Sequence, residues 1–322
     1  TYSNEGLSGA SRNFHKWGRT YKLAHGNTVR DILLNSWEGV YFDINQKGMD
    51  QMMGDIASMG GELFVMDDGW FGIEGLIRDA KKHGIKFGIW IEPEMANTTS
   101  ELYEKHPEWI LKAPQRDPVL GRGGTQVVLD LANPEVQDFV FKVVDDLMTN
   151  YPEIAYIKWD ANRPISQTNL HKDIWYRHIE AVYDIVKKLK EKHPNVLFEA
   201  CASGGGRIDY GILGIFDDFW TSDNTDAYDR LTVQDSYSYI YPIKAMRAWV
   251  TDCPNFISNR VISMKFRFHS AMMGTLGIGC NILKFTEEDS NLSKEMIALY
   301  KKIRPIIQEG DFYRLQNTSE ND

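Results

Sequence analysis

The sequence is poor in the features that mark several protein classes. Its three cysteines, Cys201, Cys253 and Cys280, are too few for a disulfide framework and are not spaced as a zinc knuckle. No apolar run reaches the roughly 18 residues that span a bilayer. The net charge is −9, and we find no basic stripe of the kind that duplex binding requires. We therefore expect no membrane span and no nucleic-acid partner.

Metal-ligand and phosphate-binding motifs are also lacking. The eight histidines are scattered, with neither His-x-x-x-His nor His-Glu-x-x-His among them. The glycine run 204–206 is followed by no Gly-Lys-Ser/Thr, and the acids around it would repel an anion. We expect these glycines to let backbone N–H groups approach a neutral ligand closely. No metal and no cofactor are therefore expected.

The sequence as given opens at Thr1 without a basic-then-apolar leader. Together with the lack of a disulfide pattern, this predicts a cytoplasmic location.

What the sequence does contain is a regular alternation of strand-like and helix-like segments. Short apolar, β-branched or aromatic runs lead into polar turns, and segments of helical period follow them. The expected strands are 31–36, 62–67, 85–92, 126–131, 154–160, 196–201, 218–222 and 278–285. The expected helices include 46–59, 134–149, 171–193 and 290–303.

Eight strands that alternate with helices in one undivided chain predict an α/β fold, a (β/α)8 or TIM barrel. We expect one domain over residues 1–322, with a helical lead-in at 1–29 and a C-terminal tail at 304–322. A doubly wound open sheet is the alternative. It would need a glycine-rich turn after the first strand, and Asn-Ser-Trp-Glu-Gly at 35–39 is not one.

A barrel enzyme carries its active site at the C-terminal ends of its strands. Here seven of the eight expected strands end in acids, tryptophans or basic residues. They include Trp37, Glu38, Asp67, Asp68, Trp90, Glu92, Glu94, Asp130, Lys158, Asp160, Glu199, Arg207 and Asp223. Carboxylates and tryptophans without metal-ligand histidines are typical of glycoside hydrolysis, in which two carboxyl groups flank the anomeric carbon. We interpret Arg207 as a structural salt-bridge partner.

Asp160 is the better candidate for a nucleophile. Lys158 lies two residues earlier on the same strand, so it points to the same side and can keep Asp160 ionised. Asp223 follows two strands later and can supply the proton. Their separation would decide between retention and inversion. Lys158 also leaves open a non-hydrolytic barrel with a Schiff-base lysine, although Asp160 would hold that lysine charged.

Five segments resemble glycoside hydrolase family 36, the α-galactosidase family. They are LFVMDDGWFG at 63–72, FGIWIEPEM at 87–95, YIKWDANR at 156–163, EACASGGGR at 199–207 and WTSDNTDA at 220–227. The resemblance implies a retaining enzyme that releases terminal α-linked galactose by double displacement with two aspartates. It implies Asp160 as nucleophile and Asp223 as acid/base. The sugar contacts that it implies are Trp37, Asp67, Asp68, Trp90, Arg122, Lys158, Cys201, Ser203 and Gly204.

The sequence departs from the family pattern in several places. Gly72 runs directly into Ile73, where family members carry a long loop with Gly-Asp-Trp. Ser203 replaces a glycine, and the segment 241–255 differs from the commoner form that shapes the mouth of the site. The family's flanking β-domains are not seen. These departures leave open an α-N-acetylgalactosaminidase of the same mechanism, or a galactose-binding barrel without turnover. The partner expected is an α-galactoside or related saccharide, and the state expected is a homo-oligomer.

Overall fold

The computed structural model describes residues 3–315 and contains a closed barrel of eight parallel strands. Around the barrel the order is β1-β10-β9-β8-β7-β6-β3-β2. The strands are β1 (Leu33–Asn35), β2 (Leu63–Met66), β3 (Lys86–Ile91), β6 (Ile154–Trp159), β7 (Leu197–Ala200), β8 (Asp218–Trp220), β9 (Met246–Thr251) and β10 (Thr275–Gly279). The predicted (β/α)8 barrel is confirmed.

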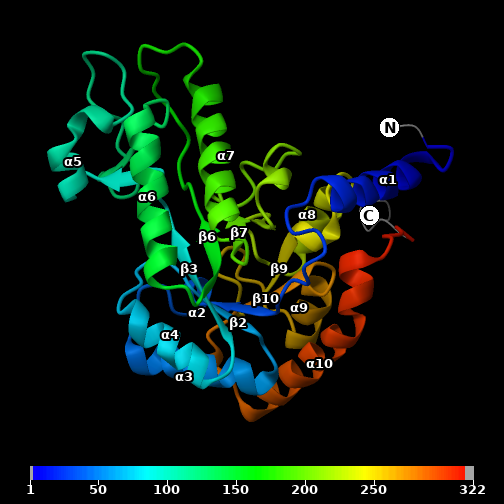
Figure 1. Cartoon of the computed structure of the whole chain (residues 1–322). Helices are drawn as coiled ribbons and strands as arrows, with labels where there is room; N and C mark the ends of the chain where they lie inside the picture. The colour runs from blue at the N-terminus through cyan, green and yellow to red at the C-terminus, as the bar shows by residue number, and fades with distance from the viewer. Residues whose placement is uncertain (1–2, 316–322) are drawn as a thin grey trace.

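The helices surround the barrel (Figure 1). They are α1 (Gly6–Tyr21), α2 (Trp37–Val40), α3 (Gln46–Met59), α4 (Ile73–Lys82), α5 (Glu101–Lys105), α6 (Pro134–Asn150), α7 (Ile174–Lys192), α8 (Asp229–Ser238), α9 (Met264–Ala271) and α10 (Glu287–Glu309). Short 3-10 turns are η1 (Pro107–Trp109), η2 (Ile212–Gly214), η3 (Ile243–Ala245) and η4 (Ile282–Lys284). Among the described residues, no helix has the length and apolarity needed to cross a membrane.

Local signals in the sequence explain where these helices begin and end. Helix α3 has the predicted bounds: the Asn45 side chain accepts from the Gly48 N–H at its start, and Gly60 ends it with φ of 99°. Helix α6 starts at Pro134 after the cap Asn133, as expected. Helix α10 begins at a capping box of Thr286 and Asp289 and continues to Glu309. The expected tail therefore begins as helix.

One predicted barrel strand is wrong. Residues 126–131 do not join the barrel, because β5 (Gln126–Val128) pairs antiparallel with β4 (Met95–Asn97) in a separate two-stranded sheet. The missing barrel strand is β9, which the sequence analysis did not predict as a strand. Arg247 interrupts its apolar run, although it is 1% exposed and held by a buried carboxylate. The last strand also begins earlier than predicted and ends at Gly279.

Alternate strand positions point into the barrel and fill it with side chains. One buried cluster consists of Leu33, Leu63, Val65, Tyr156, Leu197, Cys201, Trp220 and Trp249. A larger apolar cluster lies between the strands and the helices. In register across neighbouring strands, Trp90 pairs with Lys158 and Lys158 with Glu199. The barrel register therefore brings the polar strand ends to one level.

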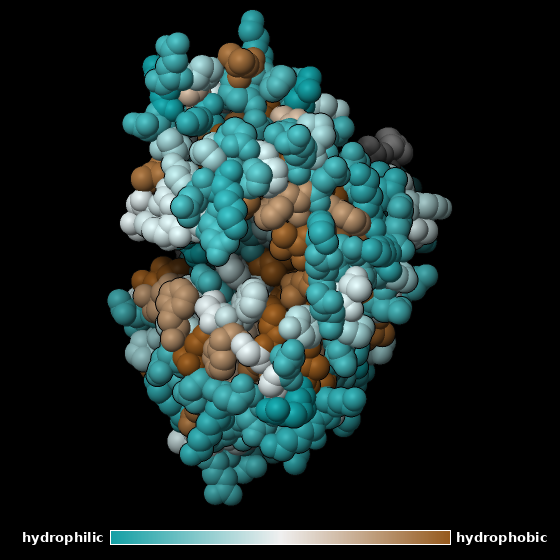
Figure 2. All heavy atoms as spheres, turned by 60° about the vertical axis from the view of Figure 1, so that its left-hand side comes forward, coloured by the Kyte–Doolittle hydropathy of each residue, from teal (hydrophilic) through white to brown (hydrophobic). Residues whose placement is uncertain are grey.

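The two ends of the described chain lie on the same side of the molecule, beside α1 and α10 (Figure 1). The Arg19 guanidinium donates to the Gly310 carbonyl at 3.2 Å, and Arg314 donates to Ser11 Oγ at 3.2 Å. On the face shown in Figure 2, most of the surface is hydrophilic, and apolar residues gather around one hollow.

A charged cluster closes the end of the barrel opposite the acidic strand ends. Asp218, at the start of β8, accepts from Arg30 Nε at 3.0 Å and from Arg247. The Tyr156 hydroxyl donates to the same carboxylate at 3.1 Å. Both arginines and Asp218 are almost fully buried. One carboxylate is thus the shared acceptor of two buried guanidinium groups, and Arg30 has a second carboxylate, Asp217 Oδ1, at 4.0 Å.

Asp218→Ala should leave both arginines buried without their shared acceptor. We expect the free energy of unfolding to fall by about 3–5 kcal/mol, the cost of breaking a buried charge pair. Urea unfolding followed by circular dichroism measures it. Glu101→Ala is the control, since its pair with Lys105 is exposed and should contribute less than about 1 kcal/mol. A loss for Asp218→Ala as small as that of the control would contradict the assigned role.

Candidate active site

The C-terminal ends of the barrel strands enclose a cavity of about 280 Å³. It is lined by Trp37, Glu38, Asp67, Asp68, Trp90, Arg122, Lys158, Asp160, Asn162, Cys201, Trp220, Asp223, Phe256 and Ile257. Nine of the eleven residues predicted for the site are among them. Ser203 and Gly204 are not. The nine predicted residues in the lining lie up to 186 positions apart in the sequence, from Trp37 to Asp223.

The floor of the cavity is a buried ion pair between β6 and the end of β2. Lys158 Nζ donates to Asp67 Oδ2 at 2.8 Å, and the Asn35 amide donates to the same oxygen at 2.6 Å. The Lys158 ammonium lies 3.9 Å from the centre of the Trp220 ring. Burial is the largest cause and opposes its charge, but the acidic neighbours together, Asp67 first among them, outweigh burial and raise the pKa of Lys158 above its ordinary value. A lysine held charged is a poor Schiff-base nucleophile.

Asp160 is positioned by three N–H donors. Its Oδ2 accepts from Trp90 Nε1 at 3.0 Å and from the Asn162 amide at 2.7 Å, and its Oδ1 accepts from the Ala161 N–H at 2.8 Å. The side chain is buried. The predicted support from Lys158 is therefore indirect: the ammonium pairs with Asp67, and hydrogen bonds from other groups hold Asp160.

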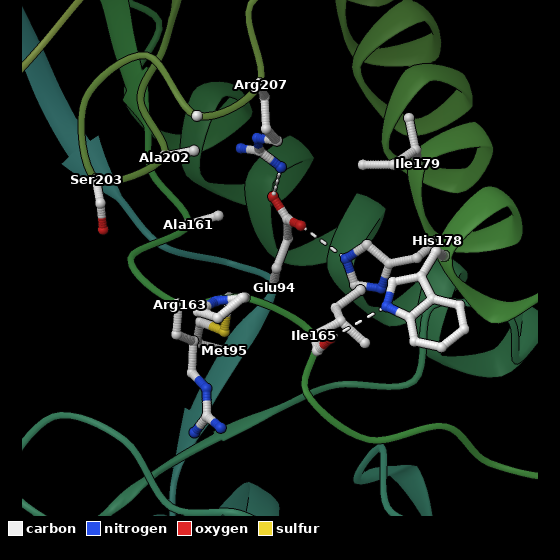
Figure 3. Close-up of a pocket in the computed structure, with 13 residues that line it drawn as sticks. Glu94, Met95, Ala161, Arg163, Ile165, His178, Ile179, Ala202, Ser203 and Arg207 are labelled. Carbon is white, nitrogen blue, oxygen red and sulfur yellow. Dashed lines mark hydrogen bonds and ion pairs between the residues drawn. The ribbon is translucent and has the colours of Figure 1, made fainter.

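A second buried cluster fixes the strand end that carries Asp160 (Figure 3). Glu94 Oε1 accepts from Trp159 Nε1 and from Arg207 Nη1, both at 2.7 Å, and Oε2 lies 2.8 Å from His178 Nε2. Burial would raise the pKa of Glu94, but Arg207 and then His178 lower it to about 2. The interpretation of Arg207 as a structural salt-bridge partner agrees with this geometry.

Ser203 and Gly204 lie outside the lining of the acidic cavity, and their predicted sugar contacts stay predictions. Ser203 lines a neighbouring cavity of about 340 Å³, and the lining of that cavity also includes Arg207 and His178 (Figure 3). Both residues have positive φ, 48° at Ser203 and 81° at Gly204. A Cβ on Gly204 would lie 2.8 Å from the Asp223 backbone nitrogen. The glycine therefore permits a close approach to the loop after β8, and its predicted approach to a ligand stays a prediction.

Several carboxyl groups around the rim resist ionisation. Burial, and then the charge of Asp160, raise the pKa of Asp223. Burial likewise raises the pKa of Asp68, against the attraction of Arg122. Arg122 Nη1 lies 3.5 Å from both Asp68 Oδ2 and Glu92 Oε2. It reaches the rim from the loop before β5, outside the barrel.

Sequence reasoning missed five lining residues as site members: Glu38, Asn162, Trp220, Phe256 and Ile257. Glu38 is buried, and burial raises its pKa to about 8, although the Thr225 hydroxyl donates to it at 2.9 Å. The position of Glu38 at the end of an expected strand could have identified it as a site residue. Phe256 and Ile257 follow β9, so recognising that strand would have placed them at the rim.

Comparison with known proteins gives one consistent answer. The family model described as Melibiase matches residues 1–75 and 72–310. The two matched parts overlap at residues 72–75, where Gly72 leads directly into α4. α-Galactosidase AgaA of Geobacillus stearothermophilus is 37% identical over 99% of this chain and 48% of its own length. α-Galactosidase C of Emericella nidulans is 38% identical over 99% of this chain and 47% of its own length.

Solved structures agree. The crystal structure of the family 36 α-galactosidase AgaA superposes with a TM-score of 0.94 at 36% identity, covering 100% of this chain and 49% of that one. The α-galactosidase of Lactobacillus brevis superposes with a TM-score of 0.94 at 35% identity, covering 98% and 46%. The chain spans about half the length of the relatives that it matches. From the matched residues and the shared barrel, we conclude that the chain belongs to the melibiase family and, within it, to glycoside hydrolase family 36.

Proposed function

We propose that this chain is the catalytic barrel of a retaining α-galactosidase, which releases terminal α-linked galactose from oligosaccharides or glycoconjugates. The observation that carries the proposal is the pairing in one cavity of Asp160, held by three N–H donors, with Asp223, whose pKa is raised. Double displacement needs a positioned carboxylate as nucleophile and a second carboxyl group that carries the proton, and the raised pKa of Asp223 favours that second role. Relatives support the substrate class, since variants of AgaA were solved with stachyose and with raffinose.

The remaining cavity residues suit a hexose. Asp67 and Asp68 would accept from the 4- and 6-hydroxyls, and Lys158 would donate to O3 and O4. Trp37 and Trp90 offer apolar faces to the C–H side of the ring. Arg122 and Cys201 would complete the contacts. Because Lys158 and Asp67 are already paired and buried, the sugar meets groups whose positions are fixed before it binds.

In the first step, an Asp160 oxygen attacks the anomeric carbon while Asp223 gives its proton to the leaving oxygen. The glycosidic bond breaks, and a covalent galactosyl ester of Asp160 forms. Esterification removes the negative charge that helps to raise the pKa of Asp223, so that pKa falls. Asp223 can then take a proton from water, which attacks the ester and releases galactose with its α-configuration.

The alternative functions have less support. Ser203 motivated an α-N-acetylgalactosaminidase, but it lines the neighbouring cavity. The galactose-binding barrel without turnover is an outcome of the experiment below. A homo-oligomer and a cytoplasmic location stay predictions.

Hydrolysis of 4-nitrophenyl α-galactoside should proceed faster than that of the corresponding α-N-acetylgalactosaminide. Proton NMR of the same reaction should show α-galactose as the first product, because two displacements restore the configuration. Initial β-galactose would overturn retention. Absence of turnover, with galactose still raising the melting temperature, would mean a binding barrel without catalysis.

Asp160→Asn should lower kcat by about 10⁴-fold or more, because an amide cannot form the ester intermediate. Steady-state hydrolysis of 4-nitrophenyl α-galactoside measures it. Asp117→Asn is the control, since Asp117 is exposed and does not line the cavity. Near-normal activity of Asp160→Asn would refute the nucleophile assignment.

Asp223→Ala should reduce turnover of melibiose by about 10²–10⁴-fold and turnover of 4-nitrophenyl α-galactoside far less, because nitrophenolate leaves without a proton. Azide should restore part of the nitrophenyl activity. In the unmodified enzyme, kcat/KM for melibiose should fall as pH rises through the raised pKa of Asp223, because the proton is then lost. Equal losses on the two substrates would argue against an acid/base role.

A further inference from the structure

An apolar lip borders the acidic cavity. We use this name for Tyr41, Phe42, Phe256 and Ile257, whose exposed fractions lie between 39% and 64%. Phe256 and Ile257 line the cavity itself. Large apolar side chains grouped in this way at a site are more often functional than incidental.

The lip is continuous with the cavity wall. Trp37, which lines the cavity, meets Tyr41 edge-on at 5.3 Å between ring centres and Phe42 at 5.2 Å. Tyr41 in turn meets the Phe256 ring at 6.5 Å. A molecule whose sugar fills the cavity would therefore extend onto aromatic surface as it leaves the mouth.

Phe256 and Ile257 place their half of the lip on the side of Asp223, whereas Phe42 lies beside Gly69, next to Asp68. The loop that carries Phe256 and Ile257 is bonded to the loop that carries Asp223, since Arg260 Nη1 donates to Asp226 Oδ1 at 2.7 Å and Ser258 Oγ donates to Asp226 Oδ2. In the proposed mechanism, Asp223 protonates the leaving oxygen. The surface beside it therefore borders the leaving group.

The turn that carries the lip is built rigidly. Asn255, which is buried, accepts through Oδ1 from the Ile257 N–H at 3.0 Å and the Ser258 N–H at 3.1 Å. Its backbone N–H donates to the Arg260 carbonyl at 3.1 Å. The two apolar side chains are thus held in place before a ligand arrives, which lowers the entropic cost of binding.

We propose that the apolar lip binds the leaving group, and that this enzyme prefers α-galactosides with aryl or alkyl leaving groups over those with sugar leaving groups. The proposal rests on the proposed α-galactosidase function. Of the four lip residues, only Tyr41 has a side-chain hydrogen-bonding group. A sugar leaving group would lose water from hydroxyls that find few partners there, whereas a phenyl or alkyl group would gain from burial.

The test compares kcat/KM for benzyl α-galactoside, methyl α-galactoside and melibiose with the full chain. Benzyl and methyl alcohols are similar as leaving groups, so their ratio reports binding of the ring and not leaving-group chemistry. We expect the benzyl substrate to exceed the methyl substrate by about 10-fold or more, from burial of the phenyl group. Melibiose should fall below the benzyl substrate.

Phe256→Ser and Ile257→Ser should each reduce the benzyl-to-methyl ratio, and the double variant should bring it close to one. Val261→Ser is the matched control, because Val261 belongs to the same loop, is 79% exposed and does not line the cavity. It should leave the ratio unchanged. A ratio near one in the unmodified enzyme, or one that neither lip variant changes, would overturn the proposal.

A binding experiment distinguishes failure of this proposal from failure of the proposed function. Calorimetric titration of Asp160→Asn with benzyl and methyl α-galactoside measures the lip without turnover. Tighter binding of the benzyl compound, lost in the double lip variant, supports the lip even if no galactoside is hydrolysed. Equal affinities overturn it. If Phe256→Ser instead converts a dimer to a monomer in sedimentation and leaves the ratio unchanged, a second copy covers the lip and the proposal is wrong.

Discussion

The charge on Lys158 is the constraint from which the electrostatics of the cavity follow. Six carboxyl groups line it or hold its rim: Glu38, Asp67, Asp68, Glu92, Asp160 and Asp223. Close carboxylates cannot all ionise in a partly dry space. Lys158 is buried and paired with Asp67 at the floor of the cavity. Burial raises the pKa of three other acids, which are Asp68, Glu92 and Glu38. The ammonium thus pairs with the carboxylate at the floor, whereas burial opposes ionisation of these three acids.

The direction of Asp160 depends on its neighbour in the strand. Successive side chains at the end of β6 point to opposite sides, so Trp159 faces the α7 layer while Asp160 faces the cavity. Trp159 Nε1 is anchored on Glu94, which Arg207 and His178 hold in turn. A change at Glu94 would therefore reach the nucleophile through the backbone, although Glu94 lines only the neighbouring cavity. Such support from outside is what keeps a site within productive geometry.

The sequence predicted the barrel and most of the site because both depend on local patterns. Acids and tryptophans at the ends of apolar runs are visible in one dimension, and the barrel brings them together. The errors have physical causes. Strand β9 was not predicted because Arg247 interrupts its apolar run. The structure accommodates this buried arginine by pairing it with Asp218. Residues 126–131 have strand character, but their partner is β4. Ser203 was assigned by motif, and its role at the sugar stays a prediction, since it lines the neighbouring cavity.

The apolar lip and the acid Asp223 act together in the proposed reaction. Burial is the largest cause of the raised pKa of Asp223, although part of the Asp223 side chain is exposed to solvent at the cavity. A leaving group on the lip would displace water from that side and raise the pKa further. The proton is then retained until the leaving oxygen develops charge and takes it. A polar leaving group would bring water with it and weaken this effect. Binding at the lip would thus act on kcat as well as on KM, because it tunes the acid that it borders.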